Sequence, residues 1–259
     1  MRAGEATKVK SADRTLAILE LLTAFPDGLT LTEIQRELEL PKSSTYTLLT
    51  TMAARGFLEQ DDRRRFRVGI RLWQVGQAYV AATDLEAAAM PFMQSVRDAL
   101  NETVQLATLD GVDNVYIGKV DSDQALRLES RVGIRLPAYA TGLGKAMLSL
   151  LRDDEIIERF AGVEFTPFTS TTITSLDVLL ARIAEVRARG HAEDDGEFTP
   201  GVFCIAVPIR ATPGQRLTAM SVSVPEVRKT PDLIERTIAN LTAATDALSA
   251  RLGYQHHQS

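Results

Sequence analysis

The stretch LPKSSTYTLLTTMAARGFLEQDDRRRFRV, residues 40–68, decides the fold of the first part of the chain. Pro41 suits the first position of a helix, and Arg55-Gly56 is a typical helix end. The side of this helix that faces the core is predicted to comprise Thr45, Leu48, Leu49 and Met52. Residues 57–60 and 66–68 then read as two short strands around a polar turn with three adjacent arginines. The stretch therefore predicts a helix followed by a basic β-hairpin.

Two more helices are predicted upstream. From Asp13, leucine and isoleucine recur every three to four residues until Pro26-Asp27-Gly28 ends the pattern. The segment from Thr30 to Glu33 fits a capping box, in which each side chain bonds the other residue's backbone N–H. A short second helix follows. A helix, a short helix, a third helix and a basic hairpin, in that order, describe a winged helix-turn-helix.

The outer side of the third helix is rich in hydroxyl groups. Such groups bond phosphates and base edges, and the N-terminus of a helix attracts phosphate. The residues predicted to contact DNA are Thr32, Lys42, Ser43, Ser44, Tyr46, Thr47, Arg63, Arg64 and Arg65. Taken alone, a three-helix unit can be a packing solution, and an arginine turn can be a solvated tip. Their direct succession favours DNA binding.

Length and composition place the chain among ordinary globular proteins. It has 259 residues, 45% of them hydrophobic and 24% charged, which fits one large or two smaller domains. No apolar run approaches the length of a membrane-spanning helix, and the first ten residues lack the apolar core of an export signal. We expect a cytoplasmic protein with no membrane association. The single cysteine, Cys204, excludes an intrachain disulfide.

Charge is distributed unevenly. The net charge is −5, but the first 80 residues carry 12 Lys and Arg against 10 Asp and Glu, and the remainder carries 17 against 24. This distribution is compatible with a basic module joined to an acidic one.

Signatures of enzymes, cofactors and metals are mostly absent. The segment from Gly142 to Lys145 resembles a phosphate-binding loop, but Tyr139 stands where that motif needs glycine and Ala146 where it needs Ser or Thr. The carboxylate run from Glu193 to Glu197 could act in acid–base chemistry or bind a cation, but such a run is more often a solvated loop. We predict no catalytic residues, no cofactor and no metal.

The chain beyond residue 69 is predicted to form a linker helix and a second domain. The domain boundaries are 1–69, 70–83 and 84–259. Leu72, Trp73, Val75 and Tyr79 recur at helical spacing and give the linker helix an apolar stripe suited to a partner. Strands are expected at residues 103–109, 115–120, 126–130, 204–209 and 217–224, the last two joined around Thr212-Pro213-Gly214. Helices are expected at residues 85–100, 144–151, 153–160, 175–189 and 231–252. This pattern predicts an α+β domain with an antiparallel sheet flanked by helices.

The whole sequence resembles the isocitrate lyase regulator (IclR) family of bacterial transcription factors. The resemblance is carried in the first domain by SADRTLAIL (11–19), LPKSSTY (40–46) and GFLE (56–59), and in the second by LPAYATGLGKA (136–146) and GVFCIAVP (201–208). It implies a winged helix-turn-helix, a GAF-like effector domain and a homodimer or homotetramer. One departure is Thr47, where the family often has arginine, so the usual DNA contact at that position is in doubt.

The resemblance also implies an effector site. It places Gly142 and Leu143 beside the carboxylate of a small organic acid, Asp194 and Cys204 on the opposite wall, and Ser221 and Ser223 on the adjacent strand. Asp194 would bond a carboxylate ligand through a ligand hydroxyl, a water or its own proton, which favours a hydroxy- or keto-acid. The favoured function is a regulator of transcription, a repressor or a dual regulator, that binds double-stranded operator DNA under control of this effector.

Two other functions remain open at this point. The second domain could be a hydrolase or isomerase beside a vestigial winged helix, and turnover of a candidate acid would support that. The winged helix could instead be a protein-interaction surface, and salt-dependent duplex binding would exclude that.

Overall fold

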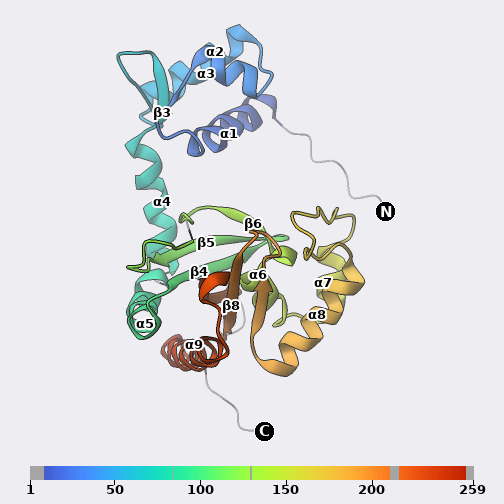
Figure 1. The fold of residues 1–259 in the computed structure, drawn as a ribbon. Helices are drawn as coiled ribbons and strands as arrows, with labels where there is room; N and C mark the ends of the chain where they lie inside the picture. The colour runs from blue at the N-terminus through green and yellow to red at the C-terminus, as the bar shows by residue number, and fades with distance from the viewer. Residues whose placement is uncertain (1–8, 84, 129, 211–215, 255–259) are drawn as a thin grey trace. The chain divides into compact units, whose positions relative to one another are not determined.

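The computed structural model describes residues 9–83, 85–128, 130–210 and 216–254. The chain divides into two compact units, residues 1–83 and 84–259 (Figure 1). None of the helices in these ranges has the length and apolar composition needed to cross a lipid bilayer.

The first unit is a winged helix-turn-helix. Its elements are α1 (Lys10–Thr23), β1 (Leu29–Thr30), α2 (Leu31–Glu37), α3 (Lys42–Ala54), β2 (Leu58–Gln60), β3 (Arg65–Val68) and α4 (Ile70–Thr83). The three strands form an antiparallel sheet in the order β1-β3-β2. The core between helices and sheet is apolar and comprises Ile18, Leu22, Leu29, Ile34, Leu49, Met52, Leu58 and Phe66.

The ends of α2 and α3 follow from local chemistry. The capping box at the start of α2 is confirmed: the Glu33 N–H donates to Thr30 Oγ1 at 3.3 Å, and the Thr30 N–H donates to Glu33 Oε2 at 2.7 Å. Pro41, predicted at the first helical position of α3, instead caps that helix with extended backbone, φ −64° and ψ 138°. The prediction was one residue early because proline's φ fits both positions, and only ψ separates them.

The wing lies close to the turn before α2. A Cβ on Gly28, whose φ is +74°, would lie 2.7 Å from the Phe66 carbonyl oxygen, so only glycine fits here. The two-residue strand β1, which the sequence analysis did not predict, brings Leu29 opposite Phe66. The wing is thereby joined to the helices as the third part of one small core.

The second unit is an α+β domain, as predicted. Its helices are α5 (Leu85–Leu100), α6 (Gly142–Leu148), α7 (Asp153–Arg159), α8 (Leu176–Arg189) and α9 (Pro231–Arg251), with two 3-10 turns, η1 (Ala138–Ala140) and η2 (Glu226–Arg228). Its strands are β4 (Thr103–Asp110), β5 (Asp113–Val120), β6 (Arg135–Pro137), β7 (Ala192–Asp195), β8 (Val202–Ile209) and β9 (Thr218–Pro225). They form one antiparallel sheet in the order β6-β5-β4-β9-β8-β7.

The two faces of this sheet differ in chemistry. One face is apolar and is covered by α5 and α9, which pack on alternate residues such as Leu106, Ile205 and Val222 (Figure 1). Helices α6 and α8 contribute to the core on the other face, which also carries buried polar side chains on the central strands. This second face holds the candidate site.

Three predictions about the second unit need correction or qualification. No strand is found in the described part of residues 126–130, and the edge strand is β6, at Arg135–Pro137. The carboxylate run from Glu193 to Glu197, favoured as a solvated loop, begins inside strand β7 and buries Asp194 and Glu197. The turn Thr212-Pro213-Gly214 lies outside the described residues, although β8 and β9 pair antiparallel as expected.

Candidate DNA-binding surface and effector cavity

The third helix of the winged helix-turn-helix presents the hydroxyl-rich side to solvent. Lys42, Ser43, Tyr46 and Thr47 are exposed, and the Tyr46 ring is 58% exposed. Thr32, on α2, is exposed as well. A large exposed phenol beside small hydroxyl groups is suited to close contact with a groove edge.

Several of these hydroxyl protons already have acceptors within the helix. Thr47 Oγ1 donates to the Ser43 carbonyl at 3.1 Å, and Ser44 Oγ donates to the Pro41 carbonyl at 3.1 Å. Ser44 Oγ also accepts from Arg14 Nη1 at 3.4 Å, so this partly buried residue links α1 and α3. With their protons engaged, the hydroxyl oxygens present mainly lone pairs, which match donors on bases better than they match phosphate oxygens.

The three wing arginines are not equivalent. Arg63 and Arg64 are exposed, and neither guanidinium has a hydrogen-bond or ion-pair partner within the described residues. Arg65 begins strand β3, donates from Nη1 to the Gly28 carbonyl at 2.7 Å and lies 3.6 Å from Glu33 Oε1. Arg65 therefore holds the wing to the start of α2, a role that the adjacent arginines in the sequence did not reveal.

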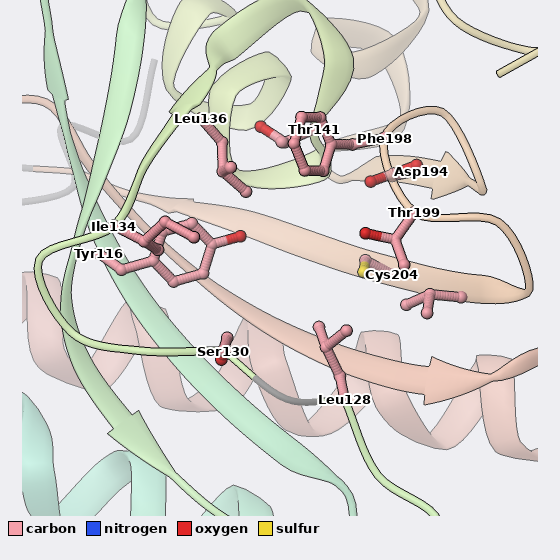
Figure 2. A pocket seen from close by; sticks show the side chains of 11 residues that line it. Tyr116, Leu128, Ser130, Ile134, Leu136, Thr141, Asp194, Phe198, Thr199 and Cys204 are labelled. Carbon is pink, nitrogen blue, oxygen red and sulfur yellow. The ribbon is translucent and has the colours of Figure 1, made fainter. Parts of the chain in front are cut away.

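The second unit contains a cavity of about 80 Å³ between the sheet and the segment before β6. Figure 2 shows the side chains of Tyr116, Asp194 and Cys204 converging on it from β5, β7 and β8. The remaining lining is mixed and comprises Leu128, Ser130, Ile134, Leu136, Thr141, Phe198, Thr199 and Val202. Apolar walls with a few converging polar groups are typical of small-molecule sites.

A chain of buried polar side chains lies behind this cavity. Gln105, 1% exposed, accepts from Ser223 Oγ at 2.8 Å and from Ser221 Oγ at 3.3 Å, and its Nε2 donates to Ser130 Oγ at 2.7 Å. Cys204 Sγ lies 3.2 Å from Ser223 Oγ. Of the predicted effector residues, Asp194 and Cys204 line the cavity, whereas Ser221 and Ser223 reach it through Gln105 and Cys204.

The start of α6 is already occupied by groups of the protein. The Gly142 and Glu197 N–H groups donate to the Asp194 carboxylate, the latter at 2.8 Å, and the Gly144 N–H donates to the capping hydroxyl of Thr141 at 3.1 Å. The side chain of Leu143 is 2% exposed and belongs to the apolar core. Asp194 thus stands where the resemblance placed a ligand carboxylate.

Sequence reasoning missed Gln105 and Tyr116, although both are polar residues on the inner side of their strands. It also missed an ion pair between Lys145 Nζ and Glu197 Oε1, whose side chains are 0% and 9% exposed. The available signal was one lysine in an apolar segment and one glutamate in a turn-like segment. Their spacing in the sequence does not show that the two side chains meet.

Burial changes the acidity of the groups around the cavity. Burial raises the pKa of Asp194 to about 6, against the Lys145 ammonium and the donated N–H groups, which lower it. Burial, followed by the nearby Asp194 charge, raises the pKa of the Cys204 thiol. Burial also raises the pKa of the Tyr116 phenol. Cys204 and Tyr116 are therefore neutral at pH 7, and Asp194 titrates nearer to neutrality than an ordinary carboxyl group.

A surface helix with a basic wing, joined in one chain to an α+β domain with a cavity, is typical of transcription regulators. Comparison with known proteins agrees. The model of the IclR helix-turn-helix domain matches residues 11–62, and that of the bacterial transcriptional regulator IclR C-terminal domain matches residues 77–250. The chain belongs to the IclR family. Because these domains and the named relatives are regulatory, the enzyme alternative is rejected.

Individual relatives span nearly the whole chain. The regulator KdgR of Escherichia coli is 32% identical over 250 residues, 95% of either chain. The repressor AllR of Salmonella typhimurium is 33% identical over 224 residues, 86% of this chain and 82% of its own. The crystal structure of an IclR homologue from Microbacterium hydrocarbonoxydans, complexed with 4-hydroxybenzoate, is 24% identical, covers 93% of this chain and 99% of its own, and superposes with a TM-score of 0.79. That similarity shows a shared fold.

Proposed function

We propose that this regulator is a repressor whose affinity for operator DNA is controlled by a small organic acid bound in the cavity of the second unit. The observation that carries the proposal is the cavity itself, where Asp194, Cys204 and Tyr116 converge between apolar walls. The acid complex of the Microbacterium homologue and the name of AllR support the ligand class and the sign of regulation.

Asp194 is the residue that selects among acids. It bonds the effector through a ligand hydroxyl, a water or its own proton, while Ser130, Thr199 and Tyr116 offer further polar contacts. Four buried residues support this wall and do not contact the effector through their side chains: Gly142, Leu143, Ser221 and Ser223. A hydroxy- or keto-acid of a few heavy atoms satisfies these groups within the available volume.

Operator binding is assigned to α3 and the wing. Tyr46 and Thr47 contact base edges. The phosphate contacts are made by Lys42, Ser43, Arg63 and Arg64. The residues that make these contacts are held in position by Thr32, Ser44 and Arg65. A cytoplasmic location is proposed because it is consistent with a DNA-binding role. The domain limits follow as 1–69 for DNA binding, 70–83 for the linker helix and 84–259 for the effector.

A second copy of the chain is the partner that fits the linker helix. Ile70, Trp73 and Val75 on α4 are 64%, 62% and 55% exposed, and a Cβ added at Gly76 would meet no atom within 4 Å. Burial of these exposed apolar side chains favours a homodimer or a tetramer. A two-fold dimer reads two related half-sites.

The test joins operator selection with ligand response. Fragments of the source genome that the purified protein retains would define the operator, and sedimentation would give the oligomeric state. Adding 4-hydroxybenzoate, pyruvate and lactate should then change operator affinity by a factor in the usual range of about 5 to 150 for at least one acid. Cys204→Trp fills the cavity, so the variant should lose the response to the acid. It should keep basal operator binding, because Cys204 lies outside the DNA-binding domain. A response that survives this change would place the effector elsewhere.

A further inference from the structure

The wall around Asp194 has an unusual charge balance. It holds two buried carboxylates, Asp194 and Glu197, and one buried ammonium, Lys145. The Lys145 ammonium donates to Glu197 Oε1, and Glu197 Oε2 has no hydrogen-bond partner within the described residues. The one cation is therefore already neutralised by Glu197, and Asp194 carries a charge without a cation of its own.

No other cationic side chain compensates Asp194. None of the described residues that line the cavity is Lys, Arg or His. At the end of strand β5, which contributes Tyr116 to the cavity, Lys119 Nζ lies 2.8 Å from Asp121 Oδ1. Beyond the end of β9, Lys229 Nζ lies 3.0 Å from Asp195 Oδ2.

The two other titratable groups that line the cavity add no positive charge. Cys204 on β8 and Tyr116 on β5 are neutral, because burial raises the pKa of both. At the start of β7, His191 Nε2 lies 3.4 Å from the Glu193 carboxylate, which is its partner. Among the described residues that line the cavity, Asp194 is therefore the one that carries a charge, and that charge is negative.

A carboxylate that enters this cavity meets another carboxylate. Two such groups in contact away from water cannot both be ionised, and they share a proton instead. We propose that an organic acid binds this cavity together with one proton taken from solvent, which is held between the acid's carboxyl group and Asp194. The net charge of the cavity then stays unchanged on binding. This inference rests on the proposed function, since it assumes an acid effector in this cavity.

The expected linkage can be stated in numbers. With a pKa of about 6, Asp194 is mostly ionised in the free protein at pH 7.5, so binding should take up nearly one proton. The affinity for the acid should then fall about tenfold for each pH unit above pH 7. The acid itself remains ionised in solution over this range and does not contribute to the slope.

The experiment is calorimetric titration of the full-length protein with 4-hydroxybenzoate, pyruvate and lactate. Each acid is titrated at about pH 7.5 in phosphate, HEPES and Tris, whose ionisation enthalpies differ, and the slope of observed enthalpy against ionisation enthalpy counts protons. We expect a slope near one for the acid that binds. Asp194→Asn, which keeps the shape and can donate to the ligand, should give a slope near zero and less than a twofold change in affinity between pH 7 and 8.

The matched control is Asp195→Asn. Asp195 is the next residue of β7, but it is exposed and paired with Lys229, so this variant should keep the wild-type slope. Thermal unfolding of both variants checks that they fold. If Asp194→Asn does not fold, the proton uptake measured for the wild type decides the question.

The outcomes separate the two proposals. Acid binding without proton uptake, or uptake that persists in folded Asp194→Asn, overturns proton sharing and leaves the acid effector intact. If none of the three acids binds at millimolar concentration between pH 5.5 and 8, the acid effector is overturned, and proton sharing with it.

Discussion

Replacement of Arg63 and Arg64 together by alanine should weaken DNA binding in a salt-dependent manner. Both side chains are exposed and have no partner within the described residues, so both are available to phosphates. Each phosphate contact contributes about 0.9 to the slope of log affinity against log salt. Two lost contacts reduce the slope by about 1.8, so the ratio of wild-type to variant affinity should change about tenfold between 50 and 200 mM salt.

Fluorescence anisotropy with labelled operator and with a scrambled duplex measures this effect at four or more salt concentrations. The loss should be equal on both duplexes, because phosphate contacts carry no sequence information. Arg67→Ala is the matched control: Arg67 is an exposed wing arginine, but its Nη2 lies 3.0 Å from Glu59 Oε2. The slope should change little in that variant. An unchanged slope in the double variant would remove the wing tip from the interface.

Arg64 allows DNA contact to be separated from stability. Its φ is +59°, a left-handed conformation in which a residue other than glycine is strained by about 1–2 kcal/mol. Arg64→Gly should therefore raise the free energy of unfolding in urea by about 1 kcal/mol while reducing the salt slope by about 0.9. A wing arginine retained only for folding would not give this combination. Loss of stability on the change to glycine would contradict the reasoning.

Three further predictions concern the second unit. Gly144→Ala places a Cβ 2.2 Å from the Ala138 carbonyl oxygen, so it should lower the free energy of unfolding in urea by about 3 kcal/mol or more, and a near-neutral effect would contradict this contact. Lys145→Met leaves Glu197 buried without its cation and should lower the free energy of unfolding by about 3–5 kcal/mol. Adding Glu197→Leu should restore much of that loss, and additive losses in the double variant would argue against pairing. The raised pKa of Asp194 makes the folded protein bind a proton more tightly than the unfolded chain does. The free energy of unfolding of the wild type should therefore fall by about 3 kcal/mol relative to that of Asp194→Asn as pH rises from about 4 to 6. Parallel profiles of unfolding free energy against pH would refute this.

Local signals in the sequence were sufficient for much of the fold. The capping box at Thr30 and Glu33 determined the start of α2, and the amphipathic pattern of Leu85–Leu100 determined α5, because caps and periodicity act within a few residues. Strands β4, β8 and β9 were predicted to within two residues, since β8 is almost wholly apolar and apolar residues recur at alternate positions in β4 and β9. The local sequence of each of these elements is therefore sufficient to predict it.

The edge strands could not be predicted in the same way. Strand β6 has three residues and owes its place to pairing with Asp113, Asn114 and Val115 of β5. Strand β7 consists of Ala192–Asp195, three of them acidic, and is defined by pairing with β8 and not by β propensity. Composition suggested a loop because the groups that bind these carboxylates are distant in sequence: the Gly142 N–H for Asp194 and the Lys229 ammonium for Asp195.

The candidate site was predictable only in part for the same reason. Asp194 and Cys204 follow from the family resemblance and do line the cavity. The function of Gly144 does not follow from the resemblance to a phosphate loop, since its missing Cβ makes room for the backbone at Ala138. Lys145 is likewise no phosphate ligand, because its ammonium binds Glu197 in the interior.

The location of unsatisfied polar atoms gives an independent reason to regard this wall as a binding site. Buried polar atoms nearly always have partners in folded proteins. Here Asn114 Nδ2 and Glu197 Oε2 have none among the described residues, although Asn114 Oδ1 accepts from Thr141 of the cavity lining at 2.8 Å and the Glu197 N–H donates to Asp194. A donor and an acceptor are thus left open on the two sides of the start of α6, each one residue removed from the cavity. A bound molecule or an ordered water beside the cavity could complete the hydrogen bonding of these two groups.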